Sequence, residues 1–212
     1  MRERYQAQLE ELNQNLVYLS NLCEQAISLA IEGFVKGDKS IADKALAIES
    51  QIDEMEKTIE RQCLSLLLKQ QPMATDLRIV SAALKMITDL ERIGDQAEDI
   101  ASLSKHTIDV NISETVKKMT QEVVKMVVNA VDSYVKQDLE LATSVIAYDD
   151  VVDDLFAKVK EEIILDIQAG TDNAESIIDT LMIAKYLERI GDHATNVAEW
   201  VVFAITGVHD DI

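Results

Sequence analysis

The hexapeptide Leu90–Asp95, with the sequence LERIGD, occurs a second time without change as Leu187–Asp192. Alanines follow both copies in register, at the aligned pairs Ala97/Ala194 and Ala101/Ala198. An earlier block repeats at a displacement of 100 residues and aligns Phe34-Val35-Lys36 with Tyr134-Val135-Lys136, Asp38 with Asp138, Ala42 with Ala142 and Asp53 with Asp153. Two matching blocks in the same order indicate an internal duplication, so we expect two related halves packed about a pseudo-twofold axis.

In both halves the hexapeptide lies within a stretch whose apolar residues recur at alternating steps of four and three. In the first half these residues are Ile79, Ala83, Met86, Leu90, Ile93, Ala97 and Ile100. In the second half they are Ile183, Leu187, Ile190, Ala194, Val197, Val201 and Ala204. This spacing predicts helices that pack against other helices at shallow angles.

Residues that end a helix are rare, because the chain holds one proline and six glycines. The breaks fall at Gly37-Asp38, at Lys69–Thr75 with Pro72, near Thr107–Asn111, at Gln137-Asp138 and at Ala169–Asp172. They predict six helices, at about residues 3–36, 38–69, 74–105, 111–137, 138–168 and 172–206. Short connections make neighbouring helices antiparallel, so we expect an all-α fold of two tandem three-helix bundles, at residues 1–107 and 108–212.

The chain is strongly acidic, with 39 acids against 20 bases and a formal net charge of −19. Such a surface repels nucleic-acid phosphates and anionic membranes, and it attracts metal cations or basic partner surfaces. Cys23 and Cys63 lie in apolar helical stretches without metal-type spacing, so we expect buried free thiols. We expect a cytoplasmic protein, because no signal-peptide pattern and no apolar run long enough for a membrane span is present.

Each half carries two acidic pairs with a spacing of four residues, which places both members of a pair on one helix face. The hexapeptides supply Glu91 with Asp95, and Glu188 with Asp192. The preceding predicted helix supplies Glu49 with Asp53, and Asp149 with Asp153. Repulsion within these pairs costs free energy that a bound cation would offset, and carboxylates suit Mg²⁺, Mn²⁺, Fe or Zn²⁺.

The predicted site is open, on the outer surface of each bundle. If Leu90 and Ile93 face the core, Glu91 and Asp95 point away from it. The helix at 38–69 buries Ala45, Ile48, Ile52, Met55 and Ile59, so its acidic pair lies just beside that seam. Glycine within a helix is unfavourable, so Gly94 and Gly191 predict the close approach of a neighbouring helix or of an ion.

Plain ion pairing is the competing interpretation, since Arg92 and Arg189 could pair with acids of an adjacent helix. Catalysis has weaker support. Di-iron carboxylate sites need Glu-x-x-His on two helices, and the chain has no such motif. His193 follows Asp192 but lies about 100° further around the helix, which favours a bystander over a ligand. No phosphate-binding loop or nucleophile motif occurs.

A duplicated three-helix unit that carries LERIGD and a preceding acidic pair resembles the PhoU family of phosphate-uptake regulators. The segments Gln71–Arg78 (QPMATDLR) and Met182–Leu187 (MIAKYL) also resemble that family. The similarity spans essentially the whole chain. It implies a non-enzymatic repressor of phosphate-starvation signalling, which links the ATPase subunit of the phosphate ABC transporter to a membrane sensor histidine kinase.

The resemblance also implies multinuclear clusters of iron or zinc on the acidic motifs. Carried onto this sequence, the metal ligands are Glu49, Asp53, Glu91, Asp95, Asp149, Asp153, Glu188 and Asp192. One turn further on, Asp99 aligns with Asn196, so the two sites need not hold equal numbers of ions.

Two other interpretations stay open beside the adaptor: a carboxylate-metal enzyme, such as a hydrolase or oxidoreductase, and a scaffold that binds no metal. The sequence also leaves the oligomeric state open. The apolar stretch Trp200–Ile205 is more than one bundle is expected to bury, which favours self-association as a homodimer.

Overall fold

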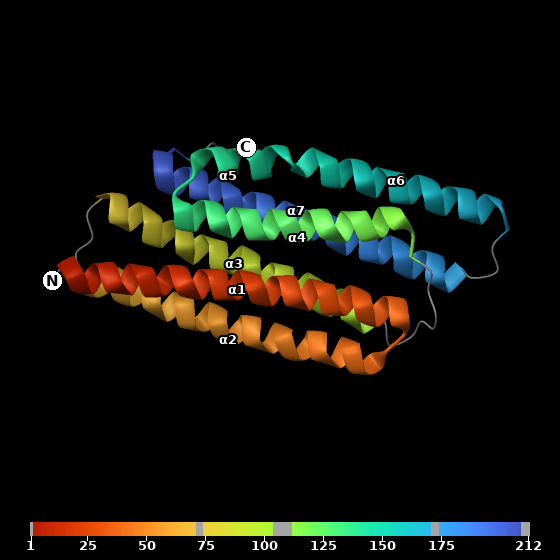
Figure 1. Cartoon of the computed structure of the whole chain (residues 1–212), viewed down its shortest axis with the longest axis horizontal. Coiled ribbons are helices and arrows are strands. Elements are labelled where there is room, and N and C mark those ends of the chain that lie inside the picture. The colour runs from red at the N-terminus through yellow and green to blue at the C-terminus, as the bar shows by residue number, and fades with distance from the viewer. Residues whose placement is uncertain (1, 71–73, 104–111, 171–173, 209–212) are drawn as a thin grey trace.

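A computed structural model describes residues 2–70, 74–103, 112–170 and 174–208. The described residues are almost entirely helical (Figure 1). The helices are α1 (Arg2–Lys36), α2 (Lys39–Gln70), α3 (Ala74–Leu103), α4 (Glu114–Lys136), α5 (Leu139–Ala147), α6 (Asp149–Gln168) and α7 (Ala174–Thr206). The all-α class and the six predicted helical segments are confirmed, with the fifth segment divided into α5 and α6.

The division of that segment lies at Tyr148. The backbone N–H of Tyr148 donates to Val145 at 3.0 Å, and the N–H of Val151 donates to Tyr148 at 3.0 Å. These three-residue spacings are tighter than those of an α-helix and interrupt it. The Tyr148 hydroxyl donates to Glu122 at 2.9 Å, and the Lys125 ammonium lies 4.9 Å from the ring centroid, so the side chain at the break is held against α4.

The turns that separate α1 from α2 and α4 from α5 fall where the sequence predicts them. Gly37 has a φ of 59° and Gln137 a φ of 52°, so equivalent positions of the two halves are left-handed. Gln137 lacks the conformational freedom of glycine, but its side-chain amide donates to the Tyr134 carbonyl at 2.7 Å. The Asp138 carboxylate then accepts from the Leu141 N–H at 3.0 Å and caps the helix that follows. The predicted connection near Thr107–Asn111 lies outside the described residues.

The two halves share one hydrophobic core. The predicted seam residues of α7 are all buried, and those of α3 are buried apart from the partly exposed Ile79. α3 packs against α7 and α1 against α4, so the buried side chains of both halves form a single cluster. Residues 1–107 and 108–212 therefore describe the repeat, while their status as separate domains stays a prediction. Cys23 and Cys63 are buried free thiols, as expected.

The stretch Trp200–Ile205 is less exposed than its sequence suggests. Val201 and Ala204 are buried, and the other four side chains are partly buried against the core. None of the helices described combines the length and the apolarity that a membrane crossing requires.

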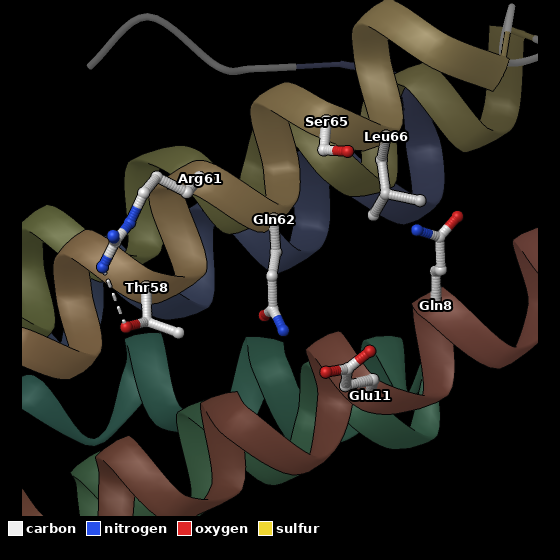
Figure 2. Close-up of a pocket in the computed structure, with 7 residues that line it drawn as sticks. All are labelled: Gln8, Glu11, Thr58, Arg61, Gln62, Ser65 and Leu66. Carbon is white, nitrogen blue, oxygen red and sulfur yellow. Dashed lines mark hydrogen bonds between the residues drawn. The ribbon is translucent and has the colours of Figure 1, made fainter.

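The first turns of α1 lie along the last turns of α2. A pocket between them is lined by Gln8, Glu11, Thr58, Arg61, Gln62, Ser65 and Leu66 (Figure 2). The Asn15 amide donates to the Gln62 side chain at 2.8 Å and joins the two helices beside this pocket.

Candidate metal centre

The acidic motifs meet where glycine lets two helices approach closely. A Cβ built on Gly94 would lie 3.1 Å from two carbons of the Ile52 side chain, and one built on Gly191 would lie 3.3 Å from Cγ1 of Val152. These separations are shorter than ordinary carbon–carbon contacts, so a side chain at either glycine would push α2 from α3 or α6 from α7. The predicted reason for both glycines, the approach of a neighbouring helix, is confirmed.

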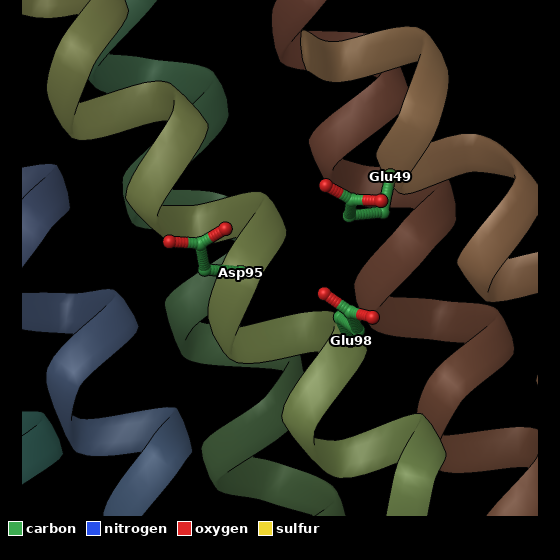
Figure 3. A group of neighbouring side chains, drawn as sticks. All are labelled: Glu49, Asp95 and Glu98. Atoms are coloured by element: carbon green, nitrogen blue, oxygen red, sulfur yellow. The ribbon is translucent and has the colours of Figure 1, made fainter.

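In the first half, three carboxylates converge across this contact. Glu49 from α2 faces Asp95 and Glu98 from α3 (Figure 3). One oxygen from each lies within 4.8 Å of the others, a spacing that a single cation can bridge. The structure thus brings together two predicted ligands, Glu49 and Asp95, with a third acid that the sequence interpretation missed.

Glu98 is the missed residue, and its position belongs to the site in both halves. It lies three residues after Asp95 and therefore one helical turn further along the same face. Its equivalent in the second half is Thr195, whose hydroxyl donates to Asp149 at 3.2 Å. Asp149 in turn is the equivalent of Glu49. The sequence does show an acid three residues after the hexapeptide. Comparison of the two halves did not select it, because the equivalent residue of the second half is a threonine.

The other two predicted ligands of the first half flank this trio. The side chain of Asp53 is 41% exposed and that of Glu91 is 27% exposed, so both line an open surface. Burial raises the pKa of Glu91, and the negative charges of Asp95 and Asp53 add to the rise. Burial likewise raises the pKa of Glu49, with further contributions from Asp53, Glu98 and Asp95.

The four predicted ligands of the second half also act on one another. Burial is the largest cause of the raised pKa of Asp149, followed by the charge of Asp153, and Glu188 contributes as well. Burial also raises the pKa of Asp192, and Glu188, Asp149 and Asp153 contribute. In each half the partly buried carboxylates also repel one another, and a bound cation would offset that repulsion.

Basic side chains already neutralise part of this charge, as the competing interpretation expects. Arg92 lies 2.9 Å from Asp95 and 3.5 Å from Glu91, so it pairs on its own helix and not with a neighbouring one. Lys185 pairs with Glu188 in the same way. Arg92 and Lys185 are about half exposed, so these ion pairs contribute little to stability.

Arg189 acts across the two halves instead. Its charge opposes the rise in the pKa of Asp99 on α3, which burial and Asp95 cause. His193 is also directed to α3, where its Nδ1 lies 2.9 Å from the carboxylate of Asp89. The same Asp89 oxygen accepts from the Asn196 amide at 3.1 Å.

The residues fit an oxygen-ligated cluster. The side chains that converge are carboxylates with one hydroxyl, which suit hard and borderline cations. They come from two helices held together by a glycine contact, and they sit on an open face that leaves room for water as a further ligand. Burial, followed by the charges of neighbouring acids, raises the pKa values of Glu49, Glu91, Asp149 and Asp192.

Comparison with known proteins agrees with this architecture. The family model described as "PhoU domain" matches twice, at residues 16–104 and 116–201. The Clostridium acetobutylicum protein named "Phosphate-specific transport system accessory protein PhoU homolog" is 34% identical, over 100% of this chain and 98% of its own. A Pseudomonas aeruginosa protein of the same name is 31% identical, over 97% of this chain and 86% of its own.

Two solved structures share the fold. The crystal structure of PhoU from Pseudomonas aeruginosa superposes with a TM-score of 0.87 at 31% identity, covering 96% of this chain and all of that one. The phosphate transport system regulatory protein PhoU from Streptococcus pneumoniae superposes with a TM-score of 0.89 at 25% identity, covering 98% of this chain and all of that one. One family model matches both halves of the chain, and the acidic motifs of the chain face each other across the helix contacts. This chain therefore belongs to the PhoU family.

Proposed function

We propose that this protein is a negative regulator of phosphate uptake and of phosphate-starvation signalling, and that it acts in the cytoplasm. The observation that carries the proposal is the match of the family model to both halves of the chain. It is supported by the relatives that align over the whole chain, which are named accessory proteins of phosphate-specific transport.

The mode of action that we propose is that of an adaptor, not an enzyme. The protein would bind the ATPase subunit of the phosphate ABC transporter and a sensor histidine kinase, and so limit uptake when phosphate is plentiful. A long helical surface with a net charge of −19 supports binding to basic faces of such partners. A homodimer is compatible with this function and belongs to the proposal.

The acidic surfaces would hold metal clusters, of iron or zinc by resemblance, with Mg²⁺ or Mn²⁺ as the alternatives from donor chemistry. In the first half the ligands would be Glu49, Asp53, Glu91, Asp95 and Glu98. In the second half they would be Asp149, Asp153, Glu188 and Asp192. Bound cations would supply positive charge that ties the two helices of each site together.

A deletion strain tests the regulatory function. We expect phosphate-starvation genes to stay active in phosphate-rich medium when the chain is absent, and to be repressed again when it is restored. Continued repression in the deletion strain would refute the proposal. Asp95→Asn and Asp192→Asn, introduced together, then show whether repression requires the acidic sites.

Purified protein tests the clusters and the enzyme alternative. Elemental analysis of protein purified without chelator or affinity-tag metal should find Fe, Zn, Mn or Mg. The absence of all four metals would refute the clusters. A metal-dependent turnover that disappears in the double variant, with the fold intact, would instead favour a carboxylate-metal enzyme.

A further inference from the structure

The two halves differ in how far their first helix extends. Residues 12–34 align with residues 112–134, from the buried pair Leu12 and Ile112 to the buried pair Phe34 and Tyr134. Yet α1 begins at Arg2, whereas α4 begins at Glu114. The first three turns of α1, about 18 Å of helix, thus have no helical counterpart in the described part of the second half.

In the first half these extra turns cover one end of the bundle. Gln8 and Glu11 of α1 lie across from the last turns of α2 and line the same pocket as Ser65 and Leu66 (Figure 2). Leu66 is 1% exposed there. The early turns of α1 therefore contact the end of α2 beside the buried Leu66, while Leu64 and Leu68 stay 44% and 83% exposed.

The matching end of the second half is exposed and apolar. Leu165, Ile167 and Ile178 are 63%, 58% and 60% exposed. Their first-half equivalents, Ser65, Leu67 and Ser81, are only partly exposed. We call residues Glu161–Gln168 and Ala174–Met182 the α6–α7 tip.

Among the described residues, no long first helix of the second half reaches the α6–α7 tip, because α4 begins at Glu114.

The charges of the two ends are opposite. From residue 161 to 184 the chain has six acids and no lysine or arginine. The equivalent stretch, residues 61 to 87, has four bases and one acid. The cover of that basic end is acidic, since α1 carries Glu10 and Glu11, and Glu11 lines the same pocket as Arg61.

We propose that the α6–α7 tip docks a basic amphipathic helix of about three turns from a partner protein. Its apolar face would cover Leu165 and Ile178, much as the early turns of α1 lie along the end of α2. Its lysines or arginines would face the exposed acids Glu161, Asp166 and Glu175. The acidic rim disfavours an anionic lipid surface, which leaves a protein helix as the occupant.

The binding test uses a synthetic 14-residue peptide of leucine and lysine in an amphipathic helical arrangement, measured by fluorescence anisotropy at 0.15 M salt with purified full-length protein. The test variant, Leu165→Ser with Ile178→Ser, installs the residues found at the equivalent first-half positions. We expect its affinity to fall at least tenfold. The control, Leu64→Ser with Leu68→Ser, changes two exposed leucines at the other end and should bind as the wild type does.

Three results would overturn the proposal. The first is that the wild type does not bind the peptide, and the second is that the test variant and the control variant bind it with equal affinity. The third is that a peptide of the same composition in shuffled order binds the wild type equally well, which would show attraction by charge alone. Sedimentation adds a fourth: a wild-type dimer that the test variant dissociates, without peptide binding, makes a second copy the occupant. Unchanged helical circular dichroism confirms that the variants are folded.

This inference rests on the proposed adaptor function, to which it adds a surface. The docking surface and the adaptor function can be refuted independently of each other. The peptide measurement decides the docking surface, whereas the deletion strain decides the regulatory function.

Discussion

The Nδ1 of His193 on α7 lies 2.9 Å from a carboxylate oxygen of Asp89 on α3, and this contact joins the two halves of the chain. Both side chains are largely buried, at 20% and 16% exposure. The two residues are 104 positions apart, and the repeated hexapeptide of neither half predicts their contact. A buried acceptor shared by His193 and Asn196 makes Asp89 a connection between the bundles.

Asp89→Ala is expected to destabilise the protein by about 1–3 kcal/mol, because it leaves the partners of the carboxylate without an acceptor. Urea denaturation measures the change. The neighbouring Thr88 is exposed, so Thr88→Ala is the control and should change stability by about 0.5 kcal/mol or less. An unchanged midpoint for Asp89→Ala would show that the contact does not hold the halves together.

Gly94→Ala is expected to lower stability even though alanine favours a helix. The gain in helix propensity is about 1 kcal/mol, whereas overpacking costs about 1–3 kcal/mol where the new Cβ meets Ile52 at 3.1 Å. Removing the obstacle should reverse the sign, so alanine at 94 should stabilise the chain in an Ile52→Ala background. A double-mutant cycle by thermal or urea unfolding tests this, and equal effects in both backgrounds would contradict it.

Glu49→Gln is expected to have opposite effects without and with metal. Without metal it removes one of the converging charges, so stability should rise by about 0.2–0.5 kcal/mol. With Mn²⁺ or Zn²⁺ the wild type should gain more stability than the variant, because a ligand is lost. Melting temperatures in EDTA and in metal measure both changes.

The control for that comparison is Glu54→Gln, since Glu54 lies on the same helix with its side chain 74% exposed. It should behave as the wild type does in both conditions. The raised pKa of Glu49 adds a pH dependence. The folded state holds this proton more tightly than the unfolded state, so metal-free stability should rise as the pH falls through that pKa.

Cys23 and Cys63 are expected to be unreactive in the native protein. Burial raises the pKa of each thiol to about 12, so almost no thiolate is present at pH 8. Ellman's reagent should label neither thiol in the native state and both in denaturant. Rapid native labelling would show that the core opens easily.

The same thiols should make the protein less stable in alkali. The unfolded thiols lose their protons near pH 9, whereas the folded ones keep them to about 12. Stability should therefore fall as the pH rises between these values. A Cys23→Ala, Cys63→Ala variant should lose that part of the slope.

Some features of the site could be predicted because they are local. Glu49, Asp95 and Gly94 follow from a spacing of four on one helix and from the identity of the two hexapeptides. Glu98 was missed because its counterpart is Thr195, so the comparison of the halves concealed it. The competing interpretation paired Arg92 with an acid of a neighbouring helix, but Arg92 pairs with Asp95, one turn along its own helix.

The sequence by itself determined the helices, their seams and the duplication, because a 3.6-residue period and an exact repeat are properties of neighbouring positions. Only the tertiary structure decided which separated residues meet. It placed Glu98 beside Glu49, directed His193 to Asp89, and left Leu165 and Ile178 exposed at the end of the second half. These outcomes depend on how far each helix extends and on which helix packs against it, and neither is encoded in the local spacing of residues.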